Sequence, residues 1–240
     1  MRGSPLILAA LLGAHIASEG KPVALELRYR QESSTSPGEF SLRLREEKWN
    51  PHETAVVVCD MWDAHHCLNA VRRVEELAPR VNALLKAMRD KGALIVHSPS
   101  SCMDFYADHP ARARAKAAPR AANLPEGIEQ WLHWIDEREK AAGYPIDHSD
   151  GGEDDDPEEH ARWAETLKER GLDPRSPWKR QIAALEIDAS RDTITDSGAE
   201  NWNLLQQRGI KNVLMVGVHT NMCVLGRPFG LRQLAKNGIN

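Results

Sequence analysis

Two short segments, far apart in the chain, end apolar runs with side chains that can do chemistry. In TAVVVCD, Asp60 directly follows five consecutive apolar residues, Ala55 to Cys59. In NVLMVGVHTNMCV, Cys223 lies a few residues after another apolar run. A thiolate can attack a carbonyl carbon, and a carboxylate can take up the thiol proton. These residues indicate nucleophilic chemistry, provided that the fold brings them together.

The position of Cys223 at the start of an expected helix bears on its reactivity. Unpaired N–H groups and the helix dipole at a helix N-terminus favour the thiolate and lower the pKa of a cysteine. Backbone N–H groups near Met222 and Cys223 would also hold the oxyanion that forms when a carbonyl is attacked. The alternative is a small buried core residue, the usual role of a free cysteine. Position alone leaves both interpretations open.

A layered α/β sheet is expected to position these two residues. Residues 55–59 and 93–98 are predicted to be buried strands, and apolar residues recur at helical spacing over residues 71–91 between them. A strand, a helix and a strand joined by short loops indicate parallel strands. Reactive groups collect beyond the carboxyl ends of such strands. Asp60 and Cys223 would share one crevice if their strands are neighbours.

Other segments elaborate this sheet. Alternating apolar and charged residues from Val23 to about Leu44 predict a β-hairpin at an edge of the main sheet or beside it. Residues 98–178 are interpreted as a helical insertion or cap. Within them, Glu153 to Asp156 are interpreted as a solvated loop, because the ligand spacing of a calcium loop is missing.

A further helix is predicted after Cys223. Pro228 should interrupt it, so that it restarts near Arg227. The C-terminal part of the sheet is expected to be missing, since a sheet of this kind would normally continue with another strand. Exposed sheet edges at that end would favour association into a homo-oligomer.

The two motifs, VVVCDMWD and GVHTNMCV, resemble those of the isochorismatase-like cysteine hydrolases, which include nicotinamidases and N-carbamoylsarcosine amidase. The likeness covers roughly residues 54–100 and 180–240. It implies a Rossmann-like, three-layer α/β/α domain over residues 21–240 with a mostly parallel sheet. It also implies a catalytic triad of an aspartate, a lysine and a cysteine, of which Asp60 and Cys223 match two.

The third member of the implied triad is a cation that precedes the cysteine. Lys179 keeps the residue type and is the preferred candidate, with Arg180 and Arg191 as alternatives. The implied reaction is hydrolysis of an amide-like C–N bond in a small molecule through a thioester on Cys223, with Asp60 as general base and acid. The residues expected to contact the substrate are Trp62, His219, Asn221, Met222 and Arg227, the last as an anion contact.

Two other functions remain open. A catalytically silent binding or assembly protein of the same fold would account for the unassigned lysine and the missing end of the sheet. A metal-dependent hydrolase would use Asp63, His65 and His66, although adjacent histidines point in different directions on regular backbone. The preferred interpretation requires no metal and no other cofactor.

The N-terminal segment indicates where the protein is located, and the composition indicates which partners it would bind. Residues 1–20 have the layout of a signal peptide, with an arginine, an apolar run and then small residues, so we expect export to the periplasm or the medium. The run is shorter than the roughly 20 residues of a membrane span, so no stable membrane insertion is expected after cleavage. With 31 basic and 35 acidic residues and no basic stripe, the chain is not expected to bind nucleic acid.

Overall fold

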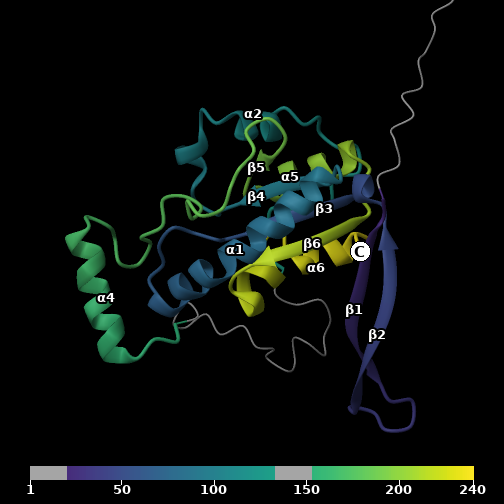
Figure 1. Cartoon of the computed structure of the whole chain (residues 1–240), viewed down its shortest axis with the longest axis horizontal. Coiled ribbons are helices and arrows are strands. Elements are labelled where there is room, and N and C mark those ends of the chain that lie inside the picture. The colour runs from purple at the N-terminus through teal and green to yellow at the C-terminus, as the bar shows by residue number, and fades with distance from the viewer. Residues whose placement is uncertain (1–20, 133–152) are drawn as a thin grey trace, which may run out of the picture.

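The centre of the protein is a four-stranded parallel sheet with the strand order β5-β4-β3-β6 (Figure 1). The structure is a computed structural model that describes residues 21–132 and 153–240. The strands are β3 (Thr54–Cys59), β4 (Leu94–Ser98), β5 (Thr193–Ile194) and β6 (Asn212–Gly217). The prediction of an α/β protein with parallel strands is therefore confirmed.

Helices cover both faces of this sheet. Successive residues of β3 point to opposite sides, so this strand contributes to two separate cores. Val56 and Val58 pack with apolar residues of α1 (Leu68–Asp90) on one face. Ala55 and Val57 share the other core with residues of α5 (Gly198–Gln207) and α6 (Leu231–Lys236). The uninterrupted apolar run of β3 is the pattern expected of a strand that is buried on both faces.

The helix α1 begins at Leu68, three residues before the predicted start. The Asp155 carboxylate accepts hydrogen bonds from the Leu68 and Asn69 N–H groups, at 2.6 and 2.7 Å. Cys67 precedes the helix and accepts from the N–H of Ala70. Because the acidic cap comes from a distant segment, the local sequence could not show where this helix starts.

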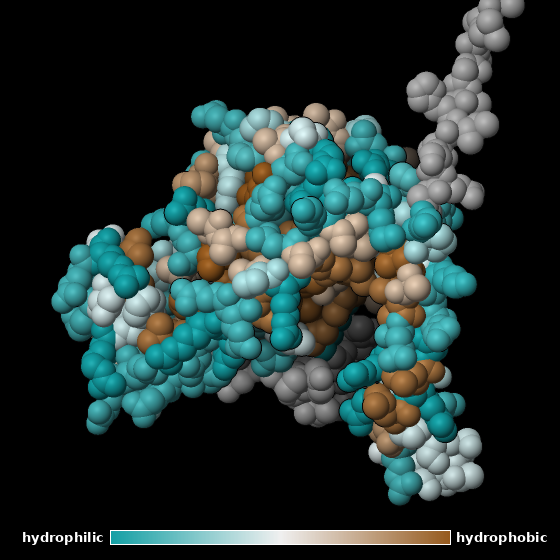
Figure 2. Space-filling model, viewed as in Figure 1, coloured by the Kyte–Doolittle hydropathy of each residue, from teal (hydrophilic) through white to brown (hydrophobic). Residues whose placement is uncertain are grey.

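The predicted hairpin is present and forms a sheet of its own. Strands β1 (Val23–Glu32) and β2 (Phe40–Trp49) pair in antiparallel register and extend away from the main sheet (Figure 1). A short 3-10 turn, η1 (Pro51–Glu53), links β2 to β3. Figure 2 shows apolar side chains exposed along the hairpin, and the exposed large ones are Tyr29, Phe40, Leu42 and Leu44.

The predicted insertion contains the turn η2 (Met103–Tyr106) and the helices α2 (Pro110–Lys116) and α4 (Pro157–Glu169). Within this insertion, residues 126–129 form a turn, and residues 133–152 lie outside the described ranges. The predicted signal peptide, residues 1–20, also lies outside them. No helix within the described ranges is long and apolar enough to cross a membrane.

The region after β6 differs from the predicted helix. A π-helical turn, η3 (Thr220–Val224), contains Cys223, and regular helix resumes only with α6 at Leu231. The predicted restart near Arg227 is therefore wrong by four residues. Pro228 lies in the gap, where its missing N–H group and fixed φ interrupt the helical hydrogen bonds.

Candidate active site

Asp60 and Cys223 follow two strands that are direct neighbours in the sheet. β3 pairs with β6 in parallel, and Cys59 lies opposite Gly217 at the carboxyl end of both strands. Asp60 and His219 then adopt left-handed backbone conformations, with φ of 50° and 58°, which turn the chain out of the sheet. The expectation that these strands are neighbours is confirmed.

The carboxylate of Asp60 is fully buried and held at both oxygens. Its Oδ1 accepts a hydrogen bond from the Ser100 N–H at 2.8 Å, and its Oδ2 accepts one from Arg227 Nε at 2.9 Å. The Arg227 guanidinium also lies 4.4 Å from the centre of the Trp131 ring and 5.9 Å from that of Trp62. Burial is the largest single influence and lowers the pKa of Arg227, but the charge of Asp60, the neighbouring Cys223 and Cys59 and the hydrogen bond to Asp60 together raise it overall. The site therefore contains a buried ion pair.

The thiol of Cys223 is neutral at rest, contrary to the effect expected of a helix N-terminus on a cysteine. The residue is 3% exposed, and burial raises the pKa of its thiol. The charge of Asp60 raises this pKa further, whereas Arg227 opposes the effect. Loss of hydration thus outweighs any benefit from the short helical turn. One expected oxyanion donor, the Met222 N–H, instead bonds to the His219 carbonyl at 3.0 Å.

All four cysteines are free and buried, and burial is the main cause that raises the thiol pKa of each. For Cys67 and Cys102 the pKa rises to about 12. The Asp60 carboxylate and the Arg227 guanidinium act on the sulfurs of both Cys59 and Cys223. Neither a low pKa nor the charged neighbours alone mark the candidate nucleophile; what sets Cys223 apart is its place after β6, with His219 at its sulfur.

His219 contacts the candidate nucleophile and lines a cavity beside it. Its Nδ1 lies 4.0 Å from Cys223 Sγ. Together with Asn221 it contributes to the wall of a cavity of about 490 Å³ between the start of α1 and the end of β6, which neither Asp60 nor Cys223 lines. Burial lowers the pKa of His219, so its imidazole is neutral near pH 7. His219 therefore stands between the open cavity and the buried sulfur.

Trp62 belongs to a stacked group of rings next to this site. Its ring centre lies 4.6 Å from that of Trp178 and 5.7 Å from that of His65. His65 in turn lies 4.6 Å from His219. Trp62 is buried and donates from Nε1 to the Ser100 carbonyl at 3.0 Å. The predicted pocket residue Trp62 thus packs behind the site and does not line the cavity.

Of the basic residues in the described ranges, Arg227 is the one that pairs with Asp60, and the preferred candidate Lys179 does not. The backbone N–H of Lys179 donates to Asp63 Oδ1 at 3.0 Å. Arg180 forms an ion pair with Asp63, and Arg191 forms ion pairs with Asp188 and Asp90. The signal that identifies Arg227 is its spacing, since its N–H bonds to the carbonyl of Cys223, four residues earlier.

The residues of the metal-dependent alternative, Asp63, His65 and His66, do not together form a metal site, although the ring centres of His65 and His66 lie 4.0 Å apart. The Asp63 carboxylate accepts backbone N–H groups of the segment at residues 179–180. His65 Nδ1 accepts the Cys67 N–H at 3.1 Å, and burial is the main cause that lowers the pKa of His65 to about 2. Within the described ranges, these three residues are not among the groups with metal-ligand spacing.

His97 lies in β4, which pairs with β3, and belongs to a buried polar network beside the candidate site. His97 Nδ1 lies 2.9 Å from Gln181 Oε1, and its Nε2 lies 3.1 Å from Asp192 Oδ2. Asp192 also receives a hydrogen bond from Arg89 Nε at 2.8 Å. Gln181 forms an isolated β-bridge with Trp62. His97 is therefore a satisfied core residue that fixes the segment beneath Trp62.

Comparison with known families adds nothing to this geometry: no protein-family model matches the chain, and no curated protein matches it. The chemistry of the site is therefore argued from the buried carboxylate, guanidinium and thiol at the carboxyl edge of the sheet.

Proposed function

We propose that this protein is a cysteine-dependent hydrolase of amide-like C–N bonds in small molecules, of the isochorismatase-like type, on a Rossmann-like three-layer domain. Asp60, Arg227 and Cys223 form its catalytic group. The observation that supports this is the buried Asp60 carboxylate, which acts on the Cys223 thiol while it is hydrogen-bonded to Arg227. In this proposal Arg227 takes the place that the resemblance gives to a lysine.

The reaction begins from a neutral thiol. As Cys223 Sγ attacks the carbonyl carbon, the S–H bond breaks and Asp60 takes the proton. Collapse of the tetrahedral intermediate breaks the C–N bond, and Asp60 returns this proton to the leaving nitrogen. Asp60 then takes a proton from a water molecule that attacks the thioester, which releases a carboxylic acid and restores the thiol. Arg227 keeps its charge and stabilises the anions on either side of it.

Substrate reaches the sulfur from the cavity that His219 and Asn221 line. Its volume of about 490 Å³ fits a small molecule, in the range of ordinary ligand pockets. Since His219 Nδ1 lies at the sulfur, the imidazole must shift when a carbonyl group enters. Its neutral state suits contact with an uncharged amide or ureido group.

The test is ammonia release from a panel of primary amides, ureido compounds and carbamoyl derivatives. Wild-type protein should release ammonia from at least one, and Cys223→Ser and Asp60→Asn should each lose on the order of 10⁴-fold in rate. Cys102→Ser is the matched control, since it alters another buried thiol and should retain activity. Undiminished activity in Cys223→Ser, or no ammonia from any compound, would overturn the proposal.

A second candidate is a silent protein of the same fold that binds amides without cleaving them. The burial of Cys223 and its raised pKa favour this alternative, because both suppress the thiolate. Mass spectrometry of protein mixed with substrate separates the two candidates. An acyl adduct on Cys223 supports the hydrolase, whereas saturable binding without adduct or ammonia supports the silent protein.

A further inference from the structure

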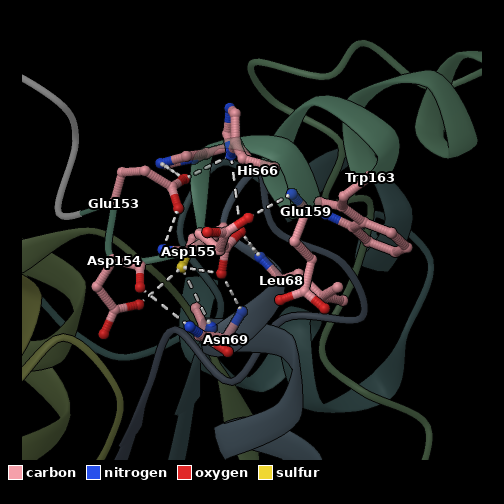
Figure 3. A network of polar contacts seen from close by, with 12 residues as sticks. His66, Leu68, Asn69, Glu153, Asp154, Asp155, Glu159 and Trp163 are labelled. Atoms are coloured by element: carbon pink, nitrogen blue, oxygen red, sulfur yellow. Dashed lines mark hydrogen bonds and ion pairs between the residues drawn. The ribbon is translucent and has the colours of Figure 1, made fainter.

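A second cluster of ionisable side chains lies where α4 meets the N-terminal end of α1 (Figure 3). It consists of Glu153, Asp155 and His160, whose donor atoms all lie within 4.8 Å of one another. His160 Nδ1 lies 2.9 Å from Glu153 Oε2 and 3.6 Å from an Asp155 oxygen. His66 Nε2 lies 4.0 Å from the same Glu153 oxygen. Figure 3 shows the Glu153 and Asp155 carboxylates beside His66.

The solvated loop expected over Glu153 to Asp156 is present only in part, because Asp154 and Asp156 are exposed whereas Glu153 and Asp155 are not. The Asp155 side chain is fully buried, and its oxygens are fixed by the N–H groups of Leu68 and Asn69. Glu153 Oε1 accepts the Asp155 N–H at 2.7 Å, which directs the other oxygen, Oε2, toward His160. Two carboxylates are thus held in place beside an imidazole.

Two of the candidate ligand atoms, Glu153 Oε2 and His160 Nδ1, are closed off from solvent, although their side chains are 19% and 38% exposed. They lie 2.9 Å apart as an ion pair, and among the described residues neither has a hydrogen bond of acceptable geometry. Leaving a buried donor or acceptor unsatisfied is costly. A cation between them would satisfy both atoms and offset the negative charge of the two carboxylates.

We propose that Glu153, Asp155 and His160 bind a divalent transition-metal ion such as zinc. The imidazole nitrogen favours zinc over calcium or magnesium, which prefer oxygen ligands alone. Ligands at about 2.0 to 2.2 Å around a tetrahedral ion lie about 3.3 to 3.6 Å from one another, so small shifts would bring these atoms to coordination distance. His66 is the nearest further imidazole and is placed to supply a fourth ligand.

A bound ion would link two helices to each other. Asp155 caps α1, while His160 lies in the first turns of α4. Arg72 on α1 also pairs with Glu159 on α4, but that pair is largely exposed and contributes little. A metal ion would therefore fasten α4 to α1, next to the cavity, whose wall Glu153 shares.

Zinc binding by the full-length protein tests this proposal. Protein freed of metal is titrated with zinc chloride against a competing chelator, and its melting temperature is recorded with and without zinc. Wild-type protein should bind one ion tightly and melt at a higher temperature with zinc. His160→Gln and Glu153→Gln should bind at least about 100-fold more weakly, since even residues that only support a ligand contribute 10- to 100-fold.

Two variants serve as controls. Glu158→Gln removes a charge from the same turn of α4, and because its side chain is exposed and outside the cluster it should bind zinc like wild type. Cys67→Ser tests the neighbouring group of Cys67, Asp154 and Asp155, and it should also bind normally. The proposal fails if wild type binds no zinc, if His160→Gln and Glu153→Gln bind it unchanged, or if Cys67→Ser alone abolishes binding.

Discussion

Arg227 Nε donates a hydrogen bond to Asp60 Oδ2 at 2.9 Å, across 167 positions of the chain. The Asp60 side chain is fully buried and that of Arg227 is 17% exposed, so little water screens the pair. The carboxyl ends of β3 and β6 are joined by this contact in addition to their backbone pairing. A buried pair of this kind is costly to break from one side, because the remaining charge is left without compensation.

Replacing Arg227 should therefore destabilise the protein. We expect Arg227→Met to lower the free energy of unfolding by about 3 to 5 kcal/mol, measured by urea denaturation. The control is Arg180→Met, which removes a partly exposed partner of Asp63 and should cost at most about 1 kcal/mol. Equal costs for the two variants would show that the Asp60 pair is not structurally important.

Gly217 should not tolerate a side chain. Its φ is +138°, and an added Cβ would lie 2.0 Å from the carbonyl oxygen of Cys59 in the neighbouring strand. Gly217→Ala should lower the free energy of unfolding, measured by urea denaturation, by at least about 3 kcal/mol. The added methyl group would strain the positive φ and would also force the backbone of the neighbouring strand to move. Gly209→Ala is matched in having positive φ but open space around the Cβ, and should cost only about 1 to 2 kcal/mol. A smaller cost at Gly217 would contradict the close approach of the strands.

The Asp192 carboxylate should make stability depend on acidic pH. Burial raises its pKa, but hydrogen bonds from His97 and Arg89 outweigh burial and lower it. A lowered pKa stabilises the folded state above the unfolded value of about 3.9, and this contribution is lost as pH falls through the folded pKa. Urea denaturation at pH 7, 5 and 3 should show Asp192→Asn less stable than wild type, with the gap narrowing below about pH 4.

The matched variant for this experiment is Asp90→Asn, which alters an exposed carboxylate in a loose pair with Arg191. It should follow the wild-type curve at all three values of pH. A gap between wild type and Asp192→Asn that stays constant down to pH 3 would rule out the assigned ionisation of Asp192.

Removing the imidazole of His219 should expose the sulfur of Cys223. Because His219 lines the cavity and contacts the sulfur, His219→Ala should be alkylated by iodoacetamide at Cys223 severalfold faster than wild type. The pKa of Cys223 is raised, so both rates should climb about tenfold per pH unit between pH 7 and 9. Peptide mapping by mass spectrometry gives the rate at each cysteine. His52→Ala, altered at a histidine in η1, should match wild type, and a plateau in rate below pH 9 would contradict the raised pKa.

Local sequence patterns predicted the centre of the fold. The apolar run of β3 and the helical spacing of α1 report directly on burial, so the elements and their order could be inferred. The hairpin followed from alternation in the same way. Predictions failed where tertiary contacts decide the ends of elements, as at the start of α1, whose cap is supplied by Asp155.

The candidate site was predictable only in part. Asp60 and Cys223 follow apolar strands, and parallel pairing places such residues at one edge. The cation could not be found by residue type, because it is an arginine, and the turn after β6 is what places it beside Asp60. The protonated state of Cys223 was also missed, since it depends on how many atoms surround the sulfur and not on its position in the chain.

Because β1 and β2 form a separate sheet, local stability differs between this hairpin and the parallel sheet. Within these two strands only Trp49, at the end next to β3, has a buried side chain. The far end, around Ser33 to Glu39, is held mainly by contacts within the hairpin itself. Backbone amides there should exchange with deuterium long before those of β3, and a protease that nicks the tip should leave the parallel sheet folded.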